Sequence, residues 1–254
     1  MLHFDIITLF PSMFDAYLGE SILKRAKEAG LVTFNPLSLR SFSKEKHHVT
    51  DEPPYGGGGG MILKPKPIFE AVAYAQAAQS EQRGKVVLLT PQGDVFDQNM
   101  AKSLSLEKHL IFICGRYEGV DERVRSELVD QEISIGDFVL TGGEVAAMVI
   151  IDAVTRLLPG ALGADGASET DSHATGLLEG PHYTRPVTFE GIEVPPVLRS
   201  GHAANIARWR REQALRRTWT RRPEMLLKAE LSEEDKRFLA TLAREQIRQM
   251  MGDG

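Results

Sequence analysis

Three short apolar runs of this chain each end in a glycine-containing turn. The turns are Thr90-Pro91-Gln92-Gly93, Gly115-Arg116-Tyr117-Glu118-Gly119 and Ser134-Ile135-Gly136-Asp137, and the third is followed by Leu140-Thr141-Gly142-Gly143-Glu144. Because glycine has no side chain, the backbone N–H and C=O groups of such turns can approach a small molecule closely. A single turn of this kind usually does no more than connect a strand to a helix. Three within sixty residues favour one ligand site built from three loops.

The spacing of these glycines excludes two common kinds of nucleotide site. No stretch of the chain has the pattern G-x-G-x-x-G of dinucleotide-binding folds. The P-loop pattern G-x-x-x-x-G-K-S/T is also absent. The backbone groups of the three turns therefore indicate a ligand site of a different type.

The elements that position these turns are predicted to be strands of a parallel sheet. The runs 86–89 and 110–114 are short, wholly apolar and rich in β-branched residues, as strands buried on both faces are. Further strands are expected at 2–10 and 31–39, with helices at 11–29, 68–82 and 143–158 and a short helix capped by Asp97. This alternation predicts an α/β domain with a mainly parallel sheet, in which ligands collect at the carboxyl ends of the strands.

Composition is that of an ordinary soluble protein of 254 residues, with 42% hydrophobic and 26% charged residues. The longest uninterrupted apolar stretch, 145–151, is far too short to span a membrane. Cys114 is the single cysteine, so no internal disulfide can form and a cytoplasmic location is expected. We expect Cys114, at the end of an apolar strand, to serve packing rather than nucleophilic catalysis.

A change in composition near residue 160 predicts a second domain. The stretch 161–176 is rich in Gly, Ala, Ser, Thr and Asp and is interpreted as a flexible linker between a domain at 1–160 and a small, all-helical domain at 177–254. Helices are expected at 203–219 and 232–251, the latter with a cap formed by Ser232 and Asp235.

Positive charge gathers in this second domain although the whole chain carries a net charge of −5. Eight arginines lie between Arg199 and Arg222, interleaved with Trp209 and Trp219. Such a patch can bind phosphates through residues such as Arg208 and Arg217. Basic helices of this kind are also often only solvated surfaces.

One loop keeps two interpretations open. Residues 40–60 form a polar stretch that ends in Pro53-Pro54-Tyr55 and the five glycines 56–60. The run of five glycines has the composition of a flexible linker. The alternative is a loop whose backbone lies against a ligand or another subunit.

Taken together, the motifs resemble a known family. Pro-Tyr-Gly-Gly-Gly at 54–58, the three turns above, Leu-Thr-Gly-Gly-Glu at 140–144 and Pro-His-Tyr-Thr-Arg-Pro at 181–186 closely resemble bacterial tRNA (guanine-N1)-methyltransferases, the TrmD family of the knotted SPOUT superfamily. The resemblance covers nearly the whole chain. It implies a deep trefoil knot at the C-terminal end of the first domain, an obligate homodimer and S-adenosylmethionine bound among the knot loops.

The resemblance also implies roles for individual residues. Arg156 matches the arginine that holds the target guanine, and Asp171 matches the proton acceptor. His182, Tyr183 and Arg185 fall in the segment that meets tRNA. The residues implied to surround the cofactor are Pro91, Gly93, Gly115, Tyr117, Glu118, Ser134, Ile135, Gly136, Asp137, Phe138, Val139, Leu140, Gly142 and Gly143.

The chemistry of guanine supports the two catalytic roles. Its N1 carries a proton at neutral pH, so attack on an activated methyl group requires a base and a positive charge near O6. Asp171 and Arg156 provide these two groups. The resemblance implies that the target is the guanine 3′ of the anticodon, tRNA position 37, and that Mg²⁺ assists the transfer, although no cluster in the sequence predicts where a metal would bind. A related knotted enzyme acting at another RNA position and a non-catalytic RNA-binding protein remain the alternatives.

Overall fold

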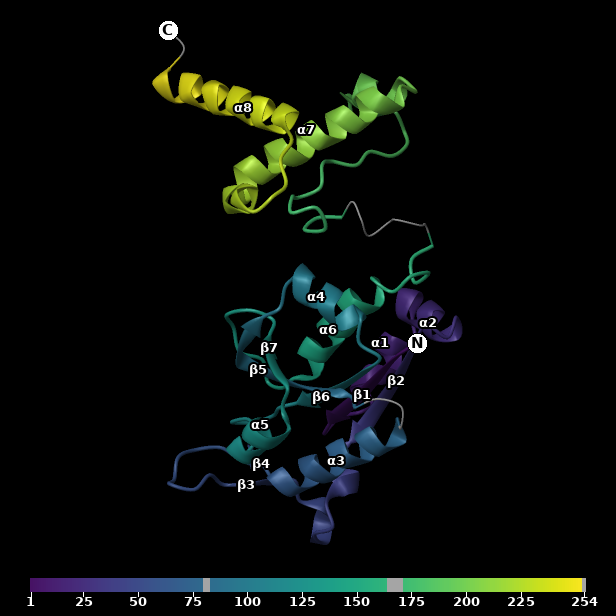
Figure 1. Ribbon diagram of the computed structural model, residues 1–254, viewed down its shortest axis with the longest axis vertical. Helices are drawn as coiled ribbons and strands as arrows, with labels where there is room; N and C mark the ends of the chain where they lie inside the picture. Colours follow the sequence, from purple (N-terminus) through teal and green to yellow (C-terminus); the bar gives the residue numbers. More distant parts are fainter. Residues whose placement is uncertain (80–82, 164–170, 253–254) are drawn as a thin grey trace. The chain divides into compact units, whose positions relative to one another are not determined.

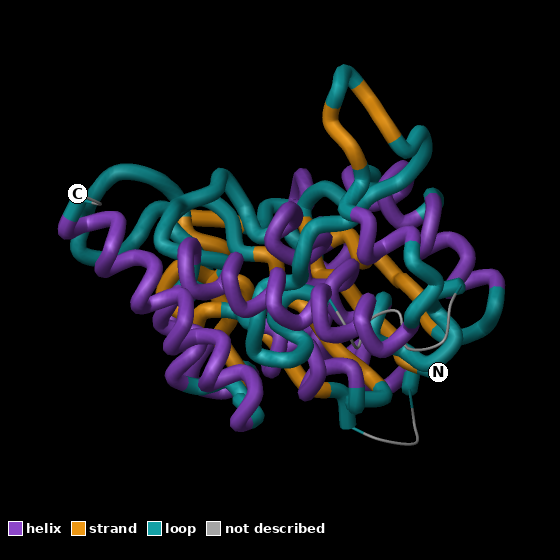
Figure 2. The backbone as a smooth tube through the Cα atoms, turned by 90° about the horizontal axis from the view of Figure 1, so that it is seen from above, coloured by secondary structure: helices purple, strands orange, loops and turns teal. Residues whose placement is uncertain are grey.

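The computed structural model describes residues 1–79, 83–163 and 171–252. The chain divides into two compact units, Met1–Asp165 and Gly166–Gly254. Figure 1 traces the elements of both units along the chain, and Figure 2 distinguishes their helices, strands and loops. No helix among the described residues is long and apolar enough to cross a membrane.

The first unit is built on a five-stranded sheet in the order β2-β1-β6-β5-β7. These strands are β1 (Leu2–Thr8), β2 (Val32–Ser38), β5 (Lys85–Val95), β6 (His109–Cys114) and β7 (Gln131–Ser134). All four pairings are parallel. Every residue of β6 is buried, because this central strand has a neighbour on each side and helices over both faces.

Helices cover the sheet on both sides, as Figure 1 shows. On one face the buried core joins the strands to α1 (Met13–Leu18), α2 (Ser21–Glu28), α4 (Gln98–Ser105) and α6 (Glu144–Thr155). A second core on the other face includes α3 (Pro65–Ala78) and α5 (Glu122–Leu128). The short strands β3 (Asp51–Glu52) and β4 (Ile62–Leu63) pair with each other around the glycine-rich loop, and two 3₁₀ turns lie at Leu39–Phe42 and Lys46–His48.

The second unit contains α7 (Ala203–Arg221) and α8 (Glu233–Met251), with 3₁₀ turns at Pro196–Arg199 and Pro223–Leu227. Leu215 and Leu242 are buried between the helices, and the Trp219 indole N–H donates a 3.1 Å hydrogen bond to Gln246. The unit is not purely helical as expected, because β8 (Thr188–Phe189) and β9 (Ile192–Glu193) form a hairpin. Its turn, Glu190-Gly191, has positive φ at both residues, and two-residue strands carry no recognisable apolar pattern.

Several predicted elements differ from the observed ones. The helix expected at 11–29 is divided into α1 and α2, and Ser21 at the break has a φ of 50°. Strand β5 extends to Val95, past the end of the apolar run at residue 89, because the chain resumes pairing with β7 after an irregularity between Leu89 and Asp94. The capping box of Ser232 and Asp235 at the start of α8 is confirmed.

The cap of α4 provides a test of the local structure. The Asp97 carboxylate accepts a 2.8 Å hydrogen bond from the backbone N–H of Met100. We expect Asp97→Ala to lower the free energy of unfolding by about 1 kcal/mol, since one N-terminal N–H of the helix loses its partner. Urea denaturation measures this. Asp97→Asn is the matched control and should change stability by only a few tenths of a kcal/mol; an equal loss in both variants would contradict the capping role.

Candidate active site

The strand order brings the three glycine turns together. Strands β6, β5 and β7 are neighbours and run parallel, so their carboxyl ends lie at one edge of the sheet. The loops that leave them enclose a cavity of about 270 Å³, just below the roughly 300–1,000 Å³ typical of small-molecule sites. Its walls come from residues 88–92, 115–120, 133–136 and 138–143, together with Arg125 and Ala146.

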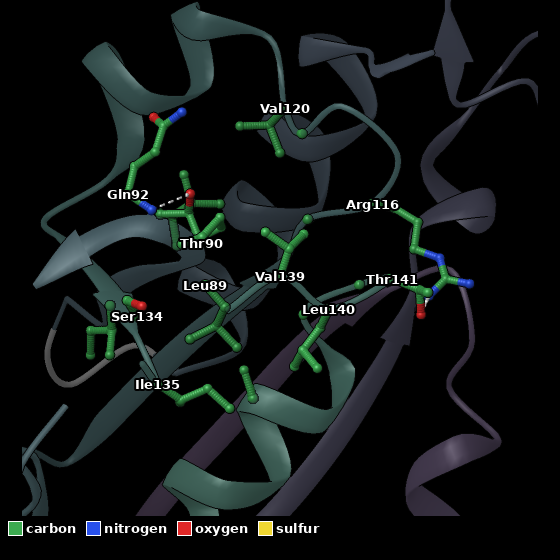
Figure 3. Close-up of a pocket in the computed structure, with 18 of the residues that line it drawn as sticks. Leu89, Thr90, Gln92, Arg116, Val120, Ser134, Ile135, Val139, Leu140 and Thr141 are labelled. Atoms are coloured by element: carbon green, nitrogen blue, oxygen red, sulfur yellow. Dashed lines mark hydrogen bonds between the residues drawn. The ribbon is translucent and has the colours of Figure 1, made fainter. Parts of the chain in front are cut away.

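The interior of this cavity is apolar and its rim is largely backbone. Figure 3 shows the side chains of Leu89, Ile135 and Leu140 gathered near the centre of the site. Around them, Tyr117 adopts a left-handed conformation with φ of 57°, and Gly119 and Gly136 have φ of 116° and 142°. Such angles turn peptide groups in directions that ordinary residues rarely provide. The site therefore combines an apolar floor with exposed backbone donors and acceptors.

Hydrogen bonds between segments fix the loops. The Gly143 N–H donates to the Gly115 carbonyl at 2.9 Å, and Arg116 and Gly142 form an isolated antiparallel bridge. On the other side, the Glu118 N–H donates to the Met61 carbonyl at 3.1 Å. The loop after β6 is thus held between the start of α6 and Met61, which follows the glycine-rich 56–60 stretch. None of residues 56–60 lines the cavity, so both interpretations of that stretch stay open.

A buried carboxylate lies behind the loops. Glu144 is almost fully buried, accepts a 2.8 Å hydrogen bond from the Thr8 hydroxyl and lies 3.7 Å from the Arg116 guanidinium. Arg116 also stacks 4.7 Å above the ring of Phe10. Burial of a charge is costly unless it is paired, so Glu144 and Arg116 hold each other in place. Arg116 lines the cavity and also bonds to Thr141, as Figure 3 shows.

Cys114 lies next to the site without the properties of a nucleophile. Burial, and secondarily the Glu144 carboxylate, raises the pKa of its thiol well above the usual value. A thiol that stays protonated is a poor nucleophile. Its burial at the end of β6 agrees with the expected packing role.

Most of the residues expected around a cofactor line the cavity. They are Pro91, Gly115, Tyr117, Glu118, Ser134, Ile135, Gly136, Phe138, Val139, Leu140, Gly142 and Gly143. Gly93 and Asp137 are not among the lining residues. Gly93 packs instead against β7, where an added Cβ would lie 2.7 Å from the Glu132 carbonyl oxygen.

The two expected catalytic residues lie outside this cavity wall. Arg156 caps the C-terminus of α6, where its N–H bonds to the Asp152 carbonyl at 3.1 Å. Asp171 is half-buried in a turn of the second unit, and its carbonyl accepts a 3.0 Å hydrogen bond from the N–H of Ala174. The expected linker 161–176 falls partly on residues 164–170, which lie outside the described residues.

The residues expected to meet tRNA lie on the second unit. His182, Tyr183 and Arg185 are exposed, and the Tyr183 ring lies 6.4 Å from that of Trp209 on α7. The arginines of α7 are less free than the sequence suggests. Arg208 lies 3.2 Å from Glu234 of α8, and Arg217 donates to the Glu179 carbonyl at 3.0 Å.

Sequence reasoning missed some lining residues. Thr90, Gln92 and Thr141 line the cavity and stand within the quoted turns, but they are not among the residues that the resemblance implies. Arg125 comes from α5 and donates a 2.6 Å hydrogen bond to the Gln92 side chain. No local signal marks Arg125, since its position depends on the pairing of β5 with β7.

A parallel α/β sheet whose glycine-rich loops enclose a cavity at the strands' carboxyl ends is typical of α/β proteins that bind a small molecule. Residues 2–228 match the profile of the family described as tRNA (Guanine-1)-methyltransferase TrmD. The tRNA (guanine-N(1)-)-methyltransferase of Anoxybacillus flavithermus is 56% identical over 235 residues, which cover 92% of this chain and 96% of the relative.

Two further relatives carry the same description. That of Moorella thermoacetica is 55% identical over 240 residues, covering 94% of this chain and 96% of the relative. That of Brevibacillus brevis is 54% identical over 244 residues, covering 96% of this chain and 99% of the relative. The chain belongs to the tRNA (guanine-1)-methyltransferase (TrmD) family, and it is an enzyme of that family.

Gly143 tests the packing of the loops. A Cβ at this position would lie 2.8 Å from the Cys114 Cα and 3.1 Å from the Gly115 nitrogen, both backbone atoms that cannot move away independently. Gly143→Ala should therefore lower the free energy of unfolding by about 1–3 kcal/mol, measured by urea denaturation.

Gly59→Ala is the matched control for Gly143→Ala. An added Cβ at Gly59 meets nothing within 4 Å, and its φ is not in the left-handed region. Its stability should stay within about 0.5 kcal/mol of wild type or rise slightly. Equal stability of the two variants would contradict the close packing of Gly143 against Cys114 and Gly115 at the end of β6.

Proposed function

We propose that this protein transfers a methyl group from S-adenosylmethionine to N1 of the guanine 3′ of the anticodon, tRNA position 37. The observation that carries the proposal is the three-loop cavity at the carboxyl ends of β5, β6 and β7, in a chain that belongs to the tRNA (guanine-1)-methyltransferase family. We place the reaction in the cytoplasm, where a tRNA substrate is available.

The cavity fits the proposed cofactor in both shape and chemistry. Leu89, Ile135 and Leu140 offer an apolar surface on which an adenine ring can lie. The turns provide backbone groups for the polar edges of the ligand, and the exposed Glu118 carboxylate at the rim complements a positive charge. When bound, S-adenosylmethionine supplies an activated methyl group on a positively charged sulfur.

The chain's own residues supply the acid–base chemistry in this proposal. Asp171 accepts the proton from guanine N1, which makes that nitrogen nucleophilic. Arg156 places its guanidinium near O6 and stabilises the negative charge that grows there. Arg156 belongs to the first unit of the chain and Asp171 to the second.

Mg²⁺ is proposed to assist the transfer, and the described residues contain no cluster of three His, Cys, Asp or Glu ligands that suits it. Mg²⁺ prefers oxygen ligands in octahedral geometry. The one convergent group of three His, Cys, Asp or Glu residues among those described contains two imidazoles. We therefore derive no step through this ion.

A homodimer and a trefoil knot are part of the proposal. Val145 and Val149, one turn apart on α6, are exposed, as are Phe138 and the 82% exposed Val139 in the adjoining loop. A second copy of the chain would cover such an apolar surface. For the knot, support comes from the return of residues 142–143 to bond with the 115–116 loop after β7.

The reaction itself is tested with labelled S-adenosylmethionine and a tRNA transcript that carries guanine 3′ of the anticodon. The product nucleoside, identified by mass spectrometry, should be N1-methylguanosine. A transcript with adenine at that position is the control and should accept no label. Transfer to both transcripts, or label at another atom, would contradict the proposal.

Variants of the two catalytic residues test their assigned roles. Asp171→Asn removes the base and should lower kcat by about 10²–10⁴-fold. Arg156→Ala should lower it about 10²–10³-fold. Calorimetric titration with S-adenosylmethionine should remain close to wild type in both, since neither residue lines the cavity. Unchanged kcat in Asp171→Asn would exclude it as the base.

Binding of tRNA by the second unit is expected to depend steeply on salt. Each arginine that contacts a phosphate contributes a slope of roughly −0.7 to −0.9 in log affinity against log salt concentration. Arg208→Ala should weaken binding and reduce the slope by roughly one contact. Arg83→Ala, in the first unit and paired with Asp130, is the matched control. If Arg208→Ala leaves the salt dependence of tRNA binding unchanged, Arg208 does not contact a phosphate.

A further inference from the structure

A second group of chemically active side chains lies in the sheet, away from the cavity. His3 and Asp5 stand on the same face of β1, and His109 begins the neighbouring strand β6. The Asp5 carboxylate is fully buried, and its Oδ2 lies 3.2 Å from Nε2 of His3 and 2.8 Å from Nε2 of His109. The three potential ligand atoms lie within 4.8 Å of one another.

Neighbouring side chains orient two of these three groups. His3 Nδ1 is hydrogen-bonded to the Thr33 hydroxyl, and the Asn35 amide donates a 2.6 Å hydrogen bond to the other oxygen of Asp5. Both partners come from β2. His3 Nε2 and Asp5 Oδ2 are thereby left to face each other.

His109 presents the same nitrogen to the cluster. Its Nδ1 has no hydrogen-bond partner among the described residues, so Nε2 is the ring nitrogen with polar neighbours. Gly84 lies beside this ring, and a side chain at that position would overlap it. Both histidines thus place Nε2 within 3.2 Å of the same Asp5 oxygen.

We propose that His3, Asp5 and His109 bind a divalent transition-metal ion, Zn²⁺ or one of similar preference, through these three atoms. Two imidazoles and a carboxylate suit Zn²⁺ rather than Mg²⁺. Bonds of about 2.0–2.1 Å in tetrahedral geometry place neighbouring ligand atoms roughly 3.3 Å apart, close to the observed 3.2 and 2.8 Å. The His3 side chain is 14% exposed, whereas those of Asp5 and His109 are 0% and 3% exposed, so an ion would enter from the side of His3.

The proposed ion would act on stability rather than on methyl transfer. Its ligands come from β1 and β6, and Thr33 and Asn35 of β2 are hydrogen-bonded to two of those ligands, so the ion would fix three neighbouring strands together. His109 is five residues before Cys114, which places the cluster roughly 17 Å from the cavity end of β6.

The experiment uses the untagged full chain, freed of metal by chelation and dialysed against Zn²⁺ or Co²⁺. Mass spectrometry of bound metal should give one Zn²⁺ per chain, Co²⁺ should produce the visible absorption of a tetrahedral site, and Zn²⁺ should raise Tm. His3→Gln should abolish all three effects, and Thr33→Val should weaken binding by roughly 10–100-fold. His202→Gln, an exposed histidine of the second unit, is the control and should behave as wild type.

Two results would overturn the proposal. Absence of stoichiometric metal in wild type would leave the cluster as a hydrogen-bonded triad only. Metal retained equally by His3→Gln would place the ion elsewhere. Circular dichroism shows whether His3→Gln is folded. If it is unfolded, the Zn²⁺ affinity of Thr33→Val tests the proposal instead, because that substitution removes a hydroxyl and leaves all three ligands in place. An affinity equal to that of wild type would then contradict the proposal.

Discussion

The parallel pairing of β6, β5 and β7 is the constraint on which the site depends. Each of these strands ends in a loop, and only their adjacency places the loops at one edge. Pairing also explains the composition of the strands, because a central strand such as β6 has helices over both faces and must be apolar throughout. The same strand pairing therefore produces both the hydrophobic core and the cavity at its edge. A change that shifts β7 relative to β5 would alter both.

Much of the arrangement could be predicted from local sequence. Apolar runs mark strands, and glycine turns mark where strands end, so the cavity walls formed by residues 115–119 and 134–136 were identifiable without coordinates. The resemblance to a known family then predicted a reaction, which amino-acid composition alone does not indicate. Local patterns failed at the break between α1 and α2, where the apolar period continues through Gly19 and Ser21 although the helix does not.

Residues brought together by strand register could not be predicted in this way. Arg125 reaches Gln92 only because α5 precedes β7, and β7 pairs with β5. Asp5 and His109 are separated by 104 residues and meet through the pairing of β1 with β6. In each case the chemistry depends on which strands are neighbours, and a single sequence without related sequences does not determine that order.

The arginines of α7 already have acidic neighbours on α8. Arg208, Arg211 and Arg216 lie within 3.6 Å of Glu234, Asp235 and Glu245, respectively. A phosphate that binds one of these guanidiniums competes with a carboxylate held at high local concentration by the fold itself. The phosphates of a free nucleotide are close together, so they can displace few of these carboxylates. If this surface binds tRNA as proposed, a folded polyanion that presents several phosphates along the helix would displace these carboxylates together, and the internal competition would favour long nucleic acids over small phosphates.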